Sequence, residues 1–164
     1  YGLTLDKSNK APEAVLQLGD LLKHMLYQKE HKVEIDKEVK QLKNYVALQQ
    51  LRLAYPARIS LNIKQDSFEG KIIPFLLLTF LENSFKHSDL QFNDKGYISI
   101  EINQTDQFHF KLENSYQCNK TNLEKSGIGL ANAKRRLELI YPETHTLKIN
   151  DEAGIFTINL QLKL

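Results

Sequence analysis

The spacing of apolar residues changes along this chain, and the change limits the folds that the chain can adopt. From Val15 to Leu26 and from Val39 to Leu53, apolar side chains recur every three or four residues, as on one face of a helix. Further on, apolar and polar residues alternate, as in half-buried strands. The alternating segments are Ile59 to Ile63, Tyr97 to Ile102, Phe108 to Leu112, Leu147 to Ile149 and Ile155 to Leu162. We therefore expect an α+β fold with one mixed, largely antiparallel sheet and helices on one face.

Proline and glycine mark the expected ends of these elements. Asp36 is the expected N-cap of the second helical segment, and Pro56 is expected to end it. A third, strongly apolar helix is expected from Pro74 to His87, because proline suits the first turn of a helix. A fourth is expected to stop before Pro142, and Gly154 is expected in the turn of a closing hairpin.

Composition excludes several classes of function. The chain has 22 basic and 20 acidic residues, a net charge of +2, which argues against a broad charge-driven nucleic-acid surface. A single cysteine, Cys118, allows neither an internal disulfide nor a cysteine zinc site and fits a reducing compartment. No apolar run approaches the roughly 20 residues that span a bilayer. Tyr1 is not an initiator methionine, so we expect a piece of a longer protein.

Polar residues gather at the end of the third predicted helix. Glu82 and Lys86 are four residues apart, as are Asn83 and His87, so these side chains lie on neighbouring parts of the helix surface. One interpretation is a solvated helix end with a surface ion pair. The other starts from Asn83, whose amide oxygen suits a hydrated Mg²⁺. Lys86 and His87 would then meet phosphate, and Glu82 would orient or deprotonate an attacking group.

A short glycine loop precedes the fourth predicted helix. Gly127 and Gly129 permit close approach of the backbone, and the N–H groups at a helix start attract phosphate. The loop lacks the third glycine of a dinucleotide fingerprint and the Gly-Lys-Ser/Thr ending of a Walker loop. Both of those nucleotide folds are disfavoured, and a simple turn is the alternative interpretation.

Together these segments resemble a known family. Glu82–His87 resembles the N box of the GHKL ATPase superfamily, and Gly127–Leu130 resembles its G2 box. The chain is similar, more narrowly, to LytS/YehU-type sensor histidine kinases, in which a Pro-x-Leu-Leu-Leu segment leads into the N box, as Ile73–Leu78 does here. Gly129–Pro142 fits the typical G2 helix throughout, and Glu38–Arg52 resembles the helical region. The resemblance covers essentially the whole chain.

The resemblance implies a Bergerat ATP-binding sandwich in residues 57–164, preceded in residues 1–56 by a helical remnant of the dimerisation and histidine-phosphotransfer region. It implies the ATP-binding catalytic region of a two-component kinase, which passes the γ-phosphoryl of ATP to a histidine and thence to a response regulator. The expected parent protein is a homodimer anchored in the inner membrane of a bacterium, with this domain in the cytoplasm.

The resemblance also implies roles for particular residues. Asn83 would be the Mg²⁺ ligand and Glu82 the base, with Lys86 catalytic and near phosphate. The remaining cofactor-binding residues that it implies are His87, Asn114, Gly127, Gly129 and Leu130.

The chain departs from the family pattern at two places. Asn114 stands where the G1 box has an aspartate that accepts a hydrogen bond from the adenine amino group, and the glycine of that box is absent. The His-Phe-Leu-Phe-Asn motif of the phosphoacceptor is also absent. We assign neither His24 nor His31 as phosphoacceptor, and we expect no autophosphorylation by these 164 residues.

Two other functions stay open. One is a GHKL ATPase with water as the nucleophile, although the short chain offers no transducer domain. The other is a non-catalytic module that dimerises through its first helices and uses the old nucleotide pocket only for docking.

Overall fold

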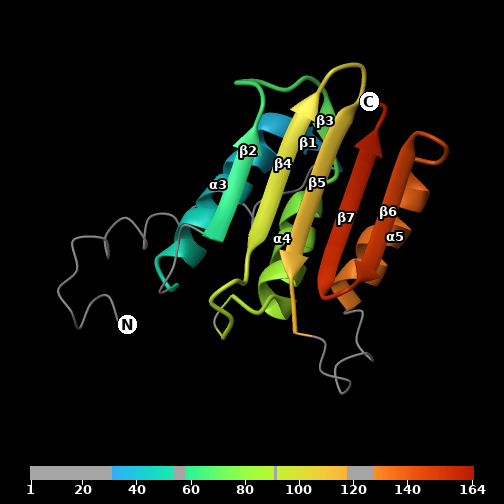
Figure 1. Ribbon diagram of the computed structural model, residues 1–164. Coiled ribbons are helices and arrows are strands. Elements are labelled where there is room, and N and C mark those ends of the chain that lie inside the picture. The colour runs from blue at the N-terminus through green and yellow to red at the C-terminus, as the bar shows by residue number, and fades with distance from the viewer. Residues whose placement is uncertain (1–30, 54–57, 91, 118–127) are drawn as a thin grey trace.

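The computed structural model describes residues 31–53, 58–90, 92–117 and 128–164 (Figure 1). In these residues, three α-helices accompany seven strands. The helices are α3 (Ile35–Gln50), α4 (Leu76–His87) and α5 (Ile128–Ile140). The strands are β1 (Val33–Glu34), β2 (Ile59–Ile63), β3 (Lys71–Ile72), β4 (Ile98–Gln104), β5 (Phe108–Ser115), β6 (His145–Glu152) and β7 (Ile155–Leu162).

Five of the strands form one mixed sheet in the order β2-β4-β5-β7-β6. β2 and β4 run parallel, and the other three pairs are antiparallel. β6 and β7 form the predicted closing hairpin, in which Ala153 and Gly154 both have positive φ, as a tight two-residue turn requires. β1 and β3 form a separate antiparallel pair of two residues each, too short for the sequence to signal. The expected mixed, largely antiparallel sheet is confirmed.

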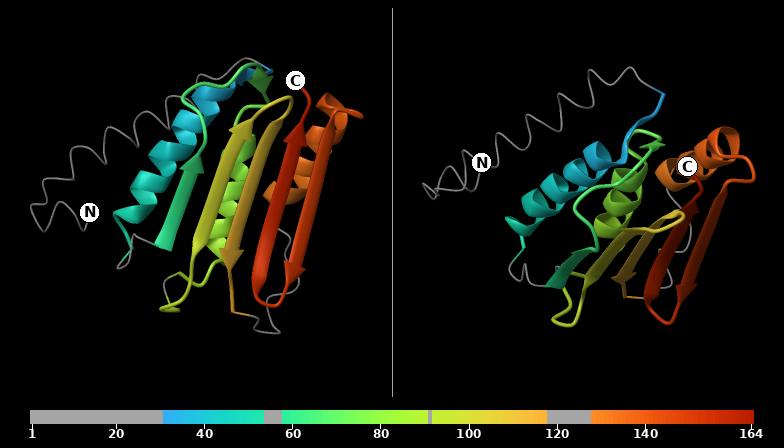
Figure 2. Two further views of the ribbon diagram at one scale, coloured as in Figure 1. Left: turned by 45° about the horizontal axis from the view of Figure 1, so that its top comes forward. Right: turned by 90° about the horizontal axis from the view of Figure 1, so that it is seen from above.

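One face of the sheet is covered by helices, as Figure 2 shows in the view along the sheet. Alternate strand residues are buried on the covered face, and the residues between them are more exposed. The buried set is Ile98, Ile100, Ile102, Phe108, Phe110, Leu112, Ile158, Leu160 and Leu162. The alternation that predicted the strands therefore also identified the face that meets the helices.

Helix α3 belongs to the same core as the sheet. Ile35, Val39, Leu42 and Val46 form its buried stripe, and the helix packs against α4. The expected division of the chain after residue 56 stays a prediction. Within the described residues, however, α3 forms no unit separate from β2–β7.

Two helix starts differ from their predicted positions. The prediction that Asp36 caps α3 is wrong, because β1 leads directly into the helix at Ile35. Asp36 lies in the first turn and its carboxylate accepts a hydrogen bond from the Phe68 backbone N–H. Helix α4 begins at Leu76, two residues after Pro74, because Phe75 adopts a left-handed conformation with a φ of 62°.

The first predicted helix, from Val15 to Leu26, lies outside the described residues. Among the described helices, none combines the length and the apolar character that crossing a membrane requires.

Candidate functional site

Helix α4, which carries the polar cluster, is held at its start by its two neighbours. The helix has no side-chain cap of its own. Instead Glu38 of α3, which is 1% exposed, accepts a hydrogen bond from the Phe75 backbone N–H at 2.7 Å. From the other side, Arg136 of α5 donates to the Pro74 carbonyl at 3.1 Å. A carboxylate at a helix N-terminus accepts hydrogen bonds from N–H groups that would otherwise be unpaired. Helix α3 therefore supplies the side-chain cap that the α4 sequence lacks.

Burial changes the chemistry of Glu38. Desolvation raises the pKa of its carboxyl from 4.5 to about 7, against the opposing effect of hydrogen bonds from the Phe75, Leu77 and Leu76 backbone and of the Arg136 charge. No individual role was predicted for Glu38. The signal was an acidic residue three positions after Ile35, on a helical face that is otherwise apolar.

One flank of α4 faces the start of α5. A Cβ added at Gly129 would lie 3.5 Å from the Thr79 methyl carbon. Thr79 is four residues before Asn83, so both lie on this flank of the helix. Asn83 is half-buried and Gly129 is exposed. The structure thus brings two of the predicted site residues to one flank. Leu130 is buried in the core, whereas Gly127 lies outside the described residues.

Replacing Gly129 with alanine tests what this glycine does. The residue is helical and has room for a methyl group at ordinary contact distance, so Gly129→Ala is expected to raise the free energy of unfolding by about 0.5 kcal/mol. Urea unfolding checks this effect. A stabilised variant that loses nucleotide affinity would assign the glycine to ligand approach, whereas a destabilised variant would contradict the prediction.

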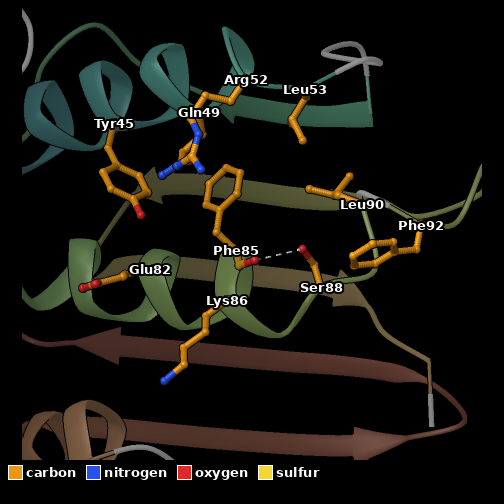
Figure 3. Close-up of a pocket in the computed structure, with 10 residues that line it drawn as sticks. All are labelled: Tyr45, Gln49, Arg52, Leu53, Glu82, Phe85, Lys86, Ser88, Leu90 and Phe92. Atoms are coloured by element: carbon orange, nitrogen blue, oxygen red, sulfur yellow. Dashed lines mark hydrogen bonds between the residues drawn. The ribbon is translucent and has the colours of Figure 1, made fainter. Parts of the chain in front are cut away.

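The opposite flank of α4 faces α3 across a cavity of about 320 Å³ (Figure 3). Glu82 and Lys86 line it together with Tyr45, Phe85 and Arg52. The Tyr45 and Phe85 rings meet edge to face, with centroids 5.7 Å apart. Burial raises the pKa of Tyr45, and the charge of Glu82 contributes to the same shift. Asn83 is not among the lining residues, so Glu82 lies on a different flank of the helix from Asn83.

Two basic residues, Lys86 and His87, end the polar segment. Lys86 is exposed, and Figure 3 shows its side chain extending from α4 away from α3. Within the described part of the chain it forms no ion pair with Glu82. His87 is also exposed; partial desolvation, and then the charge of Lys86, lower the pKa of its ring. Both causes favour the neutral form of the His87 ring.

Asn114 lies in the sheet, on the face that α4 covers. It is near the end of β5, between Ile98 of β4 and Phe156 of β7, and is fully buried. Its amide nitrogen donates to the Ser115 carbonyl at 3.1 Å, while its amide oxygen has no partner. A buried acceptor without a donor is destabilising by about 1–3 kcal/mol. A buried acceptor of this kind in a folded protein indicates that a donor from a ligand binds there.

The loop after α4 is tied to the end of β5 by Asp89, which is only 5% exposed. Its carboxylate accepts hydrogen bonds from the Ser115 hydroxyl at 2.5 Å and the Asn93 amide at 2.6 Å. Asp89 was not predicted as a site residue, because a single acidic residue in a polar loop carries no signal of burial.

Comparisons with known proteins agree with this arrangement. The family model described as "Histidine kinase" matches residues 1–56. The sensor histidine kinase/phosphatase LytS of Staphylococcus aureus (strain MRSA252) is 27% identical over 159 residues, which are 95% of this chain and 25% of the relative. The chain therefore spans about a quarter of the length of this relative.

Solved structures with the same fold are also histidine kinases. The kinase domain of the blue-light-activated histidine kinase EL346 of Erythrobacter litoralis has a TM-score of 0.59 at 10% identity, covering 99% of this chain and 83% of that one. The catalytic domain of histidine kinase ThkA has a TM-score of 0.53 at 8% identity, covering 80% of this chain and 93% of that one. The chain is LytS-like, with the fold of a histidine kinase catalytic domain. The likeness to LytS extends over 95% of this chain, while the likeness to the solved kinase structures is one of fold.

Proposed function

We propose that this chain binds ATP between α4, the start of α5 and the end of β5, and presents the γ-phosphoryl group to a histidine. The observation that carries the proposal is the convergence of the Asn83 flank of α4 with Gly129. The orphaned amide oxygen of Asn114 supports it, because the adenine amino group is a donor that would satisfy a buried acceptor.

The residues present fit a Mg²⁺ ion that is shared with the nucleotide. In the described residues no group of three His, Cys, Asp or Glu side chains could hold a metal, so a cage made only of protein is not available there. Mg²⁺ usually takes one or two protein oxygens and completes its shell with phosphate and water. Asn83 would hold it through its amide oxygen, and the bound ion would neutralise phosphate charge.

The chain's own residues have distinct proposed roles in transfer. Lys86 provides the fixed positive charge toward phosphate, and His87, as a neutral ring, donates a hydrogen bond. The γ-phosphorus breaks its bond to the bridging oxygen, leaving ADP, and bonds to a ring nitrogen of the acceptor histidine. Glu82 accepts the proton that the histidine loses. Its exposed position on the α3 flank supports access from outside the domain.

The partners and location of the parent protein follow from the same proposal. The phosphohistidine would pass its phosphoryl group to an aspartate of a response regulator. We propose a homodimeric, membrane-anchored parent protein, with this domain on the cytoplasmic side and the acceptor histidine outside these 164 residues.

Isothermal titration with ATP is the experiment that tests the proposed function. The chain is expected to bind ATP in the presence of Mg²⁺, and more weakly with EDTA. After incubation with γ-labelled ATP it is expected to carry no acid-labile phosphate. Absence of measurable ATP binding would contradict the proposal and favour a non-catalytic docking module. Acid-labile phosphate on the chain would contradict the placement of the acceptor histidine outside it.

A further inference from the structure

The orientation of the Asn114 side chain is set by the residue that follows it. The amide nitrogen of Asn114 donates to the Ser115 carbonyl oxygen at 3.1 Å. With the amide turned the other way, its oxygen would face that carbonyl, and two acceptors would oppose each other. The contact therefore leaves the Asn114 oxygen as the atom without a partner.

Ser115 is in turn fixed from three directions. Its hydroxyl donates to Asp89 at 2.5 Å and accepts from the Tyr97 backbone N–H at 2.8 Å. Its carbonyl also accepts from the Asp89 backbone N–H at 3.3 Å. One residue, Asp89, thus binds both the side chain and the backbone of Ser115. The position of the carbonyl that orients Asn114 depends on it.

The Asp89 carboxylate has little freedom to move. Asn93 donates to its second oxygen at 2.6 Å. A Cβ at Gly96 would come within 2.8 Å of the first oxygen, so only glycine leaves room for the carboxylate there. Arg58 donates to the carbonyls of Asn93 and Gly96 and holds this loop against the start of β2. A buried polar network with this many partners is rigid.

We propose that Asp89, acting through Ser115, is a positioning residue that keeps the Asn114 oxygen turned toward the nucleotide base and so selects adenine over guanine. Adenine presents an amino group where guanine presents a carbonyl oxygen. An asparagine side chain accepts a hydrogen bond from the adenine amino group only when its amide oxygen faces the base. When its amide nitrogen faces the base instead, it donates to the guanine carbonyl oxygen. This inference rests on the proposed ATP site. A carboxylate from another element thereby supports the asparagine that replaces the family's aspartate.

The test compares ATP and GTP affinities, by isothermal titration with Mg²⁺, in the 164-residue chain and its variants. The chain itself is expected to prefer ATP. Asp89→Asn and Ser115→Ala are each expected to weaken ATP binding about 10-fold and to bring the ratio of ATP to GTP affinity toward one. Asp94→Asn is the matched control, since Asp94 is exposed in the same loop, and its ratio is expected to stay unchanged.

A second variant separates orientation from general damage. An aspartate at position 114 accepts through either oxygen and needs no orienting contact. Asn114→Asp combined with Asp89→Asn is therefore expected to regain the preference for ATP, which a merely structural role for Asp89 would not produce. A folded Asp89→Asn variant with the original ratio would overturn the inference. If Asp89→Asn does not fold, the same result in Ser115→Ala would overturn it. Absence of binding to either nucleotide by the unmutated chain would instead refute the proposed ATP site.

Discussion

Replacing Asn83 with alanine is expected to remove the Mg²⁺-dependent part of ATP binding and to weaken affinity at least on the order of 100-fold. The reason is chemical, because alanine has no oxygen to offer a hard cation, and the described residues contain no cluster of three His, Cys, Asp or Glu side chains that could hold the ion without Asn83. The fold should tolerate the change. Asn83 is half-buried in the middle of α4, where alanine has the higher helix propensity.

Titration of ATP with Mg²⁺ and with EDTA measures this effect directly. The two affinities are expected to differ in the unmutated chain and to coincide in Asn83→Ala. Asn150→Ala, in the exposed part of β6, is the matched control and is expected to leave both affinities unchanged. If Asn83→Ala retained the full response to Mg²⁺, Asn83 could not be the metal ligand.

Glu38→Gln is expected to remove a pH dependence of stability. Burial raises the pKa of Glu38 from 4.5 to about 7 in the folded chain. Below the pKa of the unfolded chain, Glu38 is protonated in both the folded and the unfolded state, and its full contribution to the free energy of unfolding is present. Between the two values the unfolded chain releases the proton while the folded chain keeps it, so stability falls as pH rises. Above the pKa of the folded chain, the whole of this stability contribution is lost, which lowers the free energy of unfolding by about 3 kcal/mol.

Urea unfolding between pH 4 and 8, a range chosen around the two values of about 4.5 and about 7, measures the slope in each variant. Glutamine keeps an oxygen that can accept from Phe75 but cannot ionise, so the slope attributed to Glu38 is expected to disappear. Subtracting the unmutated curve removes the contributions of other groups, including the opposite one from His87. Glu138→Gln, exposed on α5, is the control. Identical slopes in Glu38→Gln and the unmutated chain would exclude Glu38 as the cause.

The spacing of apolar residues predicted most of the fold, because a helix or strand that is buried on one face carries apolar residues at regular intervals. It gave the longer strands, the hairpin at Gly154 and the helices α3, α4 and α5 to within a few residues. It could not give β1 and β3, whose two-residue pairing is decided by tertiary contact. Nor could it give the late start of α4, which depends on the left-handed conformation of Phe75.

The candidate site was less accessible to sequence reasoning. The motif residues could be read from their spacing, but the flank that each occupies could not, and Glu82 and Asn83 prove to face different neighbours. Asn114 was identified by the resemblance to the G1 box, while the network that orients it was not identified. That network depends on Asp89, which becomes significant only when the loop folds back onto the end of β5.

The cap that α3 provides to α4 also bears on how the domain folds. The hydrogen bond from Phe75 to Glu38 joins residues 37 positions apart, so the first turn of the motif-bearing helix is completed by a non-local contact. Formation of α4 is thereby coupled to the docking of α3, and the two elements should be acquired in one cooperative step. A fragment starting at residue 57 would contain every predicted ligand-binding residue, yet it would lack the carboxylate and the apolar stripe that hold them in place.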